Sequence, residues 1–382
     1  MKKIALSEPY LISRSLKYLK KSIYSNWVST SGPMVKEFER KICNLTGAKY
    51  AIACNSGTAA LHIGLKLAEP APGDEVIVPT LTFVATVNCV IYNNCSPIFM
   101  DCDEFFNIDK KKTLEFLKKN TFKKGNYSYN KQTKKKVVAL IITHVWGNAA
   151  EIKELVRECK KRNIKIIEDA SESIGTKYKS SLKHTGAFGL VGIISFNGNK
   201  LITTGGGGIL ITNIKKIADR AKYLTSQAKD NSIFFIHNEV GYNYRMTNLS
   251  AALGLGQIDN FKFLLNKKKE IRKMYEKKLK ASKNFELRKT PDYAYNNFWM
   301  NVVKFKKGKN RVNLNKTYLK FKKKNIEVRP IWKLNHSQKM FKNFQKYKLK
   351  KATELASTCI CVPSSASMNE KEIKLVSKIL NE

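Results

Sequence analysis

The chain has 382 residues, of which 43% are hydrophobic, so it is long enough for one large globular domain and a smaller one. No apolar run reaches the roughly 18 residues of a membrane-spanning helix, and Ser7, Glu8 and Pro9 interrupt the N-terminus before an export signal could form. None of the eight cysteines forms a CxxC pair, so we expect neither a disulfide framework nor a zinc site. Free thiols favour a reducing, cytoplasmic location.

The formal net charge of +41 could attract nucleic acid or an anionic membrane. Lysine outnumbers arginine, however, and the lysines are spread among Asn and Ile residues instead of gathering with aromatic residues on one face. We interpret the charge as a compositional bias on solvated surfaces. The sequence therefore predicts neither a specific nucleic acid nor a membrane as a partner.

The first elements predict an anion site. A helical pattern over residues 35–45 closes at Gly47, and the apolar run 50–54 reads as a strand. A second helical pattern follows, with Ser56, Gly57 and Thr58 in its first turn. Free N–H groups, two hydroxyls and a glycine there suit a phosphate, although the same residues could form an ordinary helix cap.

The next stretch places an aromatic residue between a predicted strand and a predicted helix. Residues 75–79 read as a strand, and Phe83 lies where this strand gives way to a helix that ends near Asn93. Phe83 could pack in the core or present its face to a planar ring. Residues 97–101 predict another strand, and the charged stretch 103–136 predicts a surface helix followed by a mobile loop.

The middle of the chain alternates between strands and helices. Residues 137–143 and 164–167 are apolar strands on either side of an amphipathic helix at 150–162. Such unbroken apolar strands are typical of a parallel sheet covered by helices on both faces. Ligands of these sheets bind at the carboxyl ends of the strands, which is where Asp169 lies.

Lys200 follows the next strand. The run GIISFNGNKLITTGGGG begins as a strand at Gly192, breaks at a turn, and reaches Lys200 before four glycines, Gly205 to Gly208. A lysine at the mouth of a sheet is partly desolvated, which lowers its pKa and makes it nucleophilic toward carbonyls. Lys200 could also be one more surface lysine, but Asp169 and the anion site at neighbouring positions favour a shared site.

The last third predicts a separate unit. A long helix begins near Leu249, a lysine-rich helix begins near Phe261, and strands at 299–305 and 326–331 precede a closing helix. We expect a large domain at residues 1–255 and a smaller C-terminal α+β domain at residues 256–382. The N-terminal segment is expected to pack on the smaller domain. Cys359 and Cys361 alternate as strand residues do, so we expect packed thiols.

The chain resembles the pyridoxal-phosphate-dependent sugar aminotransferases of the DegT/DnrJ/EryC1/StrS family on five motifs in the family's order: NSGTAALHIGL, GDEVIVPTLTFVATVN, IIEDASESIGT, SFNGNKLITTGGGG and GYNYRMTNLSAALGLGQ. The resemblance covers almost the whole chain. It implies the fold-type I α/β architecture, with a mostly parallel central sheet flanked by helices. It also implies pyridoxal 5'-phosphate as the cofactor.

The resemblance assigns roles to site residues. Lys200 would hold the cofactor as an internal aldimine and move a proton during transfer, and Asp169 would keep the pyridine nitrogen protonated. The other expected cofactor contacts are Gly57, Thr58 and Ser195 around the phosphate, Phe83 on the ring, Glu172 near the ring hydroxyl, and Asn243 from a neighbouring subunit. Asn243 therefore implies a homodimer with shared active sites.

The resemblance also implies the reaction. We expect a ping-pong transfer from L-glutamate to a keto carbon, C4, of a nucleotide-linked keto-deoxy sugar, with Trp332 and His336 on the sugar side. The stretch RPIWKLNHSQKMF resembles the branch that acts on 4-keto-6-deoxy hexoses of nonulosonic or bacillosamine-type pathways. The alternative is a non-catalytic nucleic-acid-binding protein on the same scaffold, which only the charge supports.

Overall fold

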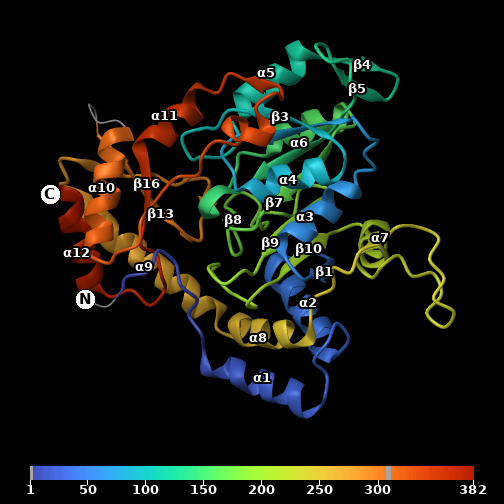
Figure 1. The fold of residues 1–382 in the computed structure, drawn as a ribbon, viewed down its shortest axis with the longest axis horizontal. Coiled ribbons are helices and arrows are strands. Elements are labelled where there is room, and N and C mark those ends of the chain that lie inside the picture. Colours follow the sequence, from blue (N-terminus) through green and yellow to red (C-terminus); the bar gives the residue numbers. More distant parts are fainter. Residues whose placement is uncertain (1–2, 307–310) are drawn as a thin grey trace.

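The structure is a computed structural model that describes residues 3–306 and 311–382. Its centre is an eight-stranded sheet (Figure 1). In chain order the strands are β1 Tyr50–Cys54, β2 Glu75–Pro79, β3 Ser96–Met100, β6 Val137–Thr143, β7 Lys165–Asp169, β9 Val191–Ser195, β10 Gly208–Thr212 and β15 Lys346–Tyr347. Their spatial order is β1-β10-β9-β7-β6-β2-β3-β15.

The strand pairs from β9 to β15 are parallel, and only the pairs of β10 with β1 and β9 are antiparallel. The prediction of a mostly parallel sheet is therefore confirmed. Parallel strands joined by helices bring their carboxyl ends to one edge, and β7 and β9 are direct neighbours there.

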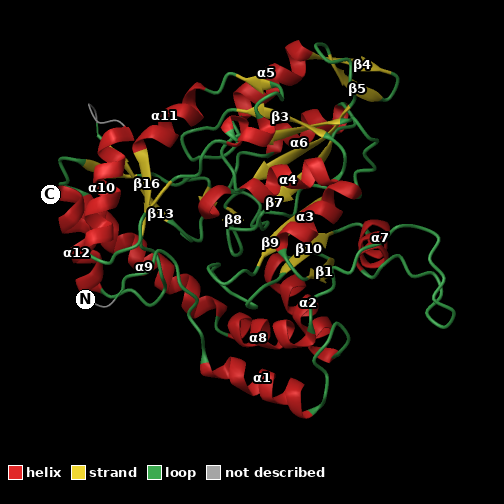
Figure 2. Cartoon of the chain, in the orientation of Figure 1, coloured by secondary structure: helices red, strands yellow, loops and turns green. Residues whose placement is uncertain are grey.

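Helices cover both faces of this sheet (Figure 2). They are α2 Pro33–Thr46, α3 Gly57–Lys66, α4 Val84–Tyr92, α5 Lys110–Asn120, α6 Lys153–Lys161, α7 Lys215–Thr225 and α8 Asn248–Asp259. On one face α3, α4 and α7 pack against Ile193 and Leu210. On the other, α5 and α6 pack against Leu140, and α2 and α8 pack against Ile209. Apolar side chains on both faces of the strands thus form a three-layer core.

A second, antiparallel sheet lies in the C-terminal third, with strand order β11-β13-β16-β14. Its strands are β11 Phe285–Leu287, β13 Asn301–Phe305, β14 Arg329–Pro330 and β16 Cys359–Val362, and the helices of this part of the chain are α9 Phe261–Leu279, α10 Arg311–Lys323, α11 Lys350–Thr358 and α12 Glu370–Asn381. Cys359 and Cys361 are buried in β16, as expected. The division of the chain into two domains stays a prediction.

The strand expected at 326–331 is shorter in the structure. Only Arg329 and Pro330 pair with β16, followed by one long hydrogen bond from the N–H of Ile331 to the carbonyl of Cys359 at 3.5 Å. Ile326 instead bridges Ile4 of the N-terminal segment, and Ser364 donates its N–H to the carbonyl of Leu6 at 2.7 Å. The N-terminal segment is thus hydrogen-bonded to C-terminal residues.

The charged stretch 103–136 corrects another expectation. The expected surface helix is α5, but the expected mobile loop forms a hairpin of β4 Thr121–Lys124 and β5 Tyr127–Asn130. Phe122 and Tyr129 stack across the hairpin with ring centroids 5.8 Å apart. Lysines dominated the composition of this stretch, and the alternating aromatic residues between them favour paired strands.

The remaining elements are short or peripheral. They are α1 Ser13–Tyr24, β8 Lys177–Tyr178, β12 Ala294–Tyr295 and the 3-10 turns η1 Val145–Gly147, η2 Asn335–Ser337 and η3 Lys339–Phe341. Helix α1 lies along α8, where the Tyr18 hydroxyl donates to Asp259 at 2.8 Å (Figure 1). None of the helices in the described ranges is long and apolar enough to cross a bilayer.

Candidate active site

A cavity of about 350 Å³ opens at the carboxyl ends of β7 and β9. Eight of the ten predicted site residues line it, namely Gly57, Thr58, Phe83, Asp169, Glu172, Ser195, Lys200 and Trp332. They come from five separate stretches of the chain, and the sheet edge brings them together. Asn243 and His336 are not among the lining residues.

One end of the cavity is the N-terminus of α3. Ser56 caps this helix, with its hydroxyl accepting the N–H of Ala59 at 3.0 Å, so the N–H groups of Gly57 and Thr58 have no partner within the helix. A Cβ at Gly57 would lie 2.9 Å from the Cβ of Ser195. Glycine therefore lets α3 approach the end of β9, and the result is a cradle for an anion.

Asp169 ends β7 at the floor of the cavity and is only 4% exposed. One carboxylate oxygen, Oδ2, accepts a hydrogen bond from the Thr86 hydroxyl at 2.6 Å, and Oδ1 accepts the N–H of Ser171 at 3.1 Å. The carboxylate is thus held in one orientation while it borders the cavity.

Lys200 lies in the turn after β9, and its Nζ faces two groups. The Oε1 of Glu172 is 3.2 Å away, and the centroid of the Trp299 ring is 4.3 Å away. The indole N–H of Trp299 donates to the carbonyl of Asn199 at 2.8 Å, so Trp299 also fixes the residue before Lys200. The amine is therefore held between a carboxylate and an aromatic face.

Glu172 accepts a hydrogen bond from a residue whose backbone has an uncommon conformation. Its Oε2 accepts the N–H of Trp146 at 2.8 Å, and Trp146 has a left-handed φ of 54° within η1. This conformation is uncommon for a bulky residue, and such strain clusters at functional sites. Burial raises the pKa of Glu172, an effect that the nearby Lys200 ammonium opposes.

Aromatic rings form one wall. Phe83 is 54% exposed at the start of α4, unusual for so apolar a side chain at the edge of a core. Trp332 lies between Phe83 and Trp146, with ring centroids 6.1 Å and 5.1 Å away. The exposed ring of Phe83 offers a stacking surface for a planar ligand.

Asn243 and His336 lie elsewhere. Asn243 is exposed, and its carbonyl accepts a hydrogen bond from the Asn55 side chain at 3.3 Å. The Nδ1 of His336 is 2.7 Å from the hydroxyl of Thr80, and burial lowers the pKa of His336. Their expected roles toward the cofactor and the sugar stay predictions.

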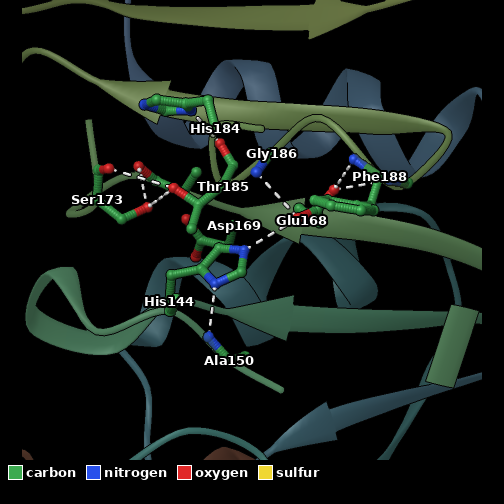
Figure 3. A network of polar contacts seen from close by, with 12 residues as sticks. His144, Ala150, Glu168, Asp169, Ser173, His184, Thr185, Gly186 and Phe188 are labelled. Atoms are coloured by element: carbon green, nitrogen blue, oxygen red, sulfur yellow. Dashed lines mark hydrogen bonds and ion pairs between the residues drawn. The ribbon is translucent and has the colours of Figure 1, made fainter. Parts of the chain in front are cut away.

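A buried network behind Asp169 fixes the strand that carries it (Figure 3). Glu168 accepts the N–H groups of Phe188 and Gly189 at 2.6 and 2.7 Å and that of Gly186 at 2.9 Å. The Nε2 of His144 is 3.1 Å from the same carboxylate. Burial alone would raise the pKa of Glu168, but these donors hold it below its usual value.

The cavity lacks the features of a metal centre. Within residues 3–306 and 311–382, no group of three or more His, Cys, Asp or Glu side chains could hold a metal ion. An anion cradle, a buried carboxylate, an enclosed amine and an exposed ring face instead fit a flat, phosphorylated aldehyde with a ring nitrogen. Pyridoxal phosphate has this chemistry.

Sequence analysis did not identify Thr86, Trp146 or Trp299. Thr82 and Thr86 are four residues apart at the entrance of a helix, a spacing that could have placed both hydroxyls on one face. No local pattern distinguishes Trp299, because it reaches Lys200 only through the packing of a distant segment.

Comparison with known proteins identifies the scaffold. The model of the DegT/DnrJ/EryC1/StrS aminotransferase family matches residues 9–381. EpsN of Bacillus subtilis (strain 168), named as a proposed pyridoxal phosphate-dependent aminotransferase, is 34% identical over 99% of this chain and 95% of its own. The GDP-perosamine synthase of Escherichia coli O157:H7 is 31% identical over 100% of this chain and 99% of its own.

A solved structure shares the fold. Helicobacter pylori PseC, an aminotransferase involved in the biosynthesis of pseudoaminic acid, superposes with a TM-score of 0.88 and 24% identity, over 99% of this chain and 98% of its own. This likeness confirms the expected fold-type I architecture. The chain therefore belongs to the DegT/DnrJ/EryC1/StrS aminotransferase family, and it is a pyridoxal-phosphate-dependent aminotransferase.

Proposed function

We propose that the protein transfers the amino group of L-glutamate to a keto carbon, C4, of a nucleotide-linked keto-deoxy sugar in two ping-pong half-reactions. The observation that carries this proposal is that Lys200, Asp169 and the α3 anion cradle border one cavity. The relative named GDP-perosamine synthase supports a nucleotide-linked sugar. The narrower assignment to a nonulosonic or bacillosamine-type pathway stays a prediction.

Two residues carry the chemistry in this proposal. Pyridoxal phosphate, when bound, supplies an aldehyde that accepts amino groups and a ring that accepts an electron pair. Lys200 attaches the cofactor through its amine and, once released, carries the proton between the substrate carbon and the cofactor. Asp169 keeps the pyridine nitrogen protonated. The position of Nζ in the cavity, 3.2 Å from Glu172, supports the first role.

The other cavity residues bind and orient. The N–H groups of Gly57 and Thr58, with the Ser195 hydroxyl, would hold the phosphate, and Phe83 would offer its face to the ring. Glu172 would contact the ring hydroxyl. Trp332 borders the open side of the cavity, which supports a place for it beside the sugar.

We also propose a homodimer in which Asn243 of one protomer reaches the phosphate site of its partner. Asn243 is exposed, and the neighbouring loop presents Ile233, Phe234 and Phe235, which are 77%, 74% and 68% exposed. Such apolar exposure marks an interaction surface. A cytoplasmic location, and the absence of specific nucleic-acid or membrane partners, stay predictions.

The test uses purified protein with added pyridoxal phosphate. A visible absorption band forms, borohydride fixes the cofactor to the protein, and peptide mass analysis finds it on Lys200. Glutamate then bleaches the band, and a nucleotide-linked 4-keto sugar restores it while acquiring an amine. Lys200→Ala abolishes the band, whereas the control Lys119→Ala, which changes an exposed lysine on α5, retains it.

Two results would contradict the proposal. Cofactor fixed to another lysine would remove the assigned role of Lys200. Failure of every nucleotide-linked keto sugar to restore the band, after glutamate has bleached it, would leave an aminotransferase with a different acceptor. The non-catalytic alternative predicts salt-sensitive DNA binding without the band, and the family assignment favours the enzyme over it.

A further inference from the structure

Three buried threonine hydroxyls lead across the cavity floor to Asp169. Thr86 lies in the first turn of α4, Thr82 just before that helix, and Thr143 at the end of β6. Their side chains are 0%, 1% and 3% exposed. The oxygen–oxygen distances are 3.1 Å from Thr143 to Thr82, 2.9 Å from Thr82 to Thr86 and 2.6 Å from Thr86 to the Oδ2 of Asp169.

The direction of this chain of hydrogen bonds follows from proton counting. A carboxylate only accepts, so the single proton of the Thr86 hydroxyl points at Asp169. Thr86 can then only accept from Thr82 and, by the same argument, Thr82 can only accept from Thr143. All three hydroxyls therefore donate toward Asp169, and each bond polarises the next.

We propose that Thr86, backed by Thr82 and Thr143, is a positioning residue that holds Asp169 as an oriented carboxylate facing the cofactor's ring nitrogen. This inference rests on the proposed role of Asp169. Thr86 engages Oδ2, while Oδ1 receives only a backbone N–H, from Ser171 at 3.1 Å, and is the oxygen with room for a further donor.

The residues around Thr82 and Thr86 support a role for these threonines in holding Asp169. The carbonyl of Thr82 accepts the side-chain amide of Asn335 at 2.8 Å, which fixes the Thr82 segment from the C-terminal part of the chain. Thr86 lies at the N-terminal end of α4, where the helix dipole favours a neighbouring negative charge. Asp169 in turn contributes to raising the pKa of Glu172 and of the buried thiol of Cys89, so both groups lie within its electrostatic reach.

The test measures two properties of the cofactor-loaded protein besides its activity. They are the dissociation constant of pyridoxal phosphate and the pH at which its ¹⁵N-labelled ring nitrogen loses a proton. Thr86→Val keeps the shape but removes the donor, so Asp169 can turn away from the ring nitrogen, and we expect binding about 10- to 100-fold weaker, the effect of losing that charge-assisted hydrogen bond between cofactor and carboxylate. The ring nitrogen should lose its proton at a lower pH. Thr86→Ser, which keeps the hydroxyl, should restore both properties.

Thr143, at the far end of this chain of hydrogen bonds, gives a second, independent check of the role of the threonines. Thr143→Val should weaken binding only about two- to threefold, because it removes polarisation and not the bond itself. Combined with Thr86→Val it should add nothing further, since that chain is already broken. The matched control is Thr113→Val, which removes an equally buried hydroxyl of α5 that donates to the carbonyl of Asp109 at 2.7 Å. If Thr86→Val does not fold, Thr82→Val takes its place in the test. We then expect a loss of cofactor binding between the losses given for Thr86→Val and Thr143→Val.

The outcomes separate this inference from the proposed function. If Asp169→Asn shifts both readouts and Thr86→Val shifts neither, the threonine chain is overturned while the role of Asp169 stands. The chain is also overturned if Thr86→Ser fails to restore them, or if Thr86→Val and Thr143→Val have additive effects. If Asp169→Asn itself changes nothing, the assignment of Asp169 fails, and the threonine chain fails with it.

Discussion

At the scale of single residues, the pair of Lys200 and Glu172 is the most testable contact. The two charged groups are 3.2 Å apart, and their side chains are 13% and 5% exposed. Glu172→Gln keeps an oxygen that can accept the Trp146 N–H but leaves the Lys200 ammonium unpaired. We expect a loss of roughly 1–3 kcal/mol of unfolding free energy, between the values of surface and buried pairs.

The same substitution should cost less once cofactor is bound, because attachment to the cofactor removes the free ammonium that Glu172 pairs with. Thermal unfolding with and without pyridoxal phosphate measures this difference. The control is Glu270→Gln, which breaks an exposed pair with Lys267 and should change stability by less than about 0.5 kcal/mol in either state. An equal loss in both states of Glu172→Gln would show that the pair persists in the loaded protein.

Site residues that follow a local pattern, such as an apolar strand, could be predicted from the sequence. Site residues that come together only when distant segments pack could not. Asp169 and Lys200 each follow an apolar strand, so the rule that ligands bind at strand ends placed both. Trp299 reaches Lys200 from a segment about a hundred positions later in the sequence, and its place depends on how that segment packs. Trp146 contributes its N–H to Glu172 only because of its left-handed backbone, and the glycine that follows it, Gly147, does not indicate that the bulky residue before it shares a positive φ.

At the scale of elements, the contact between α3 and β9 shapes the anion cradle. A Cβ at Gly57 would lie 2.9 Å from the Cβ of Ser195, so Gly57→Ala must push the helix away from the strand. We expect a loss of about 1–3 kcal/mol of stability, the usual cost of overpacking, together with weaker phosphate binding. Urea unfolding and titration with inorganic phosphate measure the two effects.

Ser195→Gly provides the matched control for this contact. It removes the atoms that the new methyl group would meet, so adding it to Gly57→Ala should recover part of the lost stability, even though Ser195→Gly alone is destabilising. If the double variant were less stable than the sum of the two single changes predicts, the clash would not be the cause.

Element boundaries show the same contrast between local and distant causes. The strand predicted at residues 137–143 is β6, with the same ends, because an unbroken apolar run is decisive on its own. The hairpin of β4 and β5 was missed because the lysines of this stretch outweighed its alternating aromatic residues. Strand β14 is only two residues long because Ile326 pairs with Ile4 of the N-terminal segment and not with β16.

At the scale of the whole molecule, the order of the strands in the central sheet could not be predicted from the sequence. Alternating strands and helices predicted a parallel sheet, but nothing local predicts that β10 enters between β1 and β9 in the antiparallel sense. Strand β15 joins the far edge of the same sheet from residues 346–347, long after the second sheet has begun. Such pairings depend on the complete fold, and so does the placement of the 332–336 segment beside the cavity.

At the same scale, two buried histidines, His62 and His184, should each contribute a loss of stability in mild acid, because burial keeps both neutral in the fold. The Nε2 of His184 accepts the N–H of Gly175 at 2.8 Å, so its only proton is on Nδ1, facing the carbonyl of Thr185. Burial lowers the pKa of His184 to about 4, and also that of His62 to about 4. In the unfolded chain both pKa values return to about 6.5.

Between pH 6.5 and about 4 the unfolded chain therefore binds two protons that the folded protein does not. Unfolding free energy then decreases as the pH falls, by about 1.4 kcal/mol per pH unit for each histidine, and is unaffected by them above pH 6.5. Urea unfolding across this range measures the slope. His184→Gln keeps a donor and an acceptor but does not titrate, so it should change the slope by the contribution of one histidine, about 1.4 kcal/mol per pH unit. An unchanged slope in His184→Gln would mean that His184 is already protonated in the fold, with its bond from Gly175 lost.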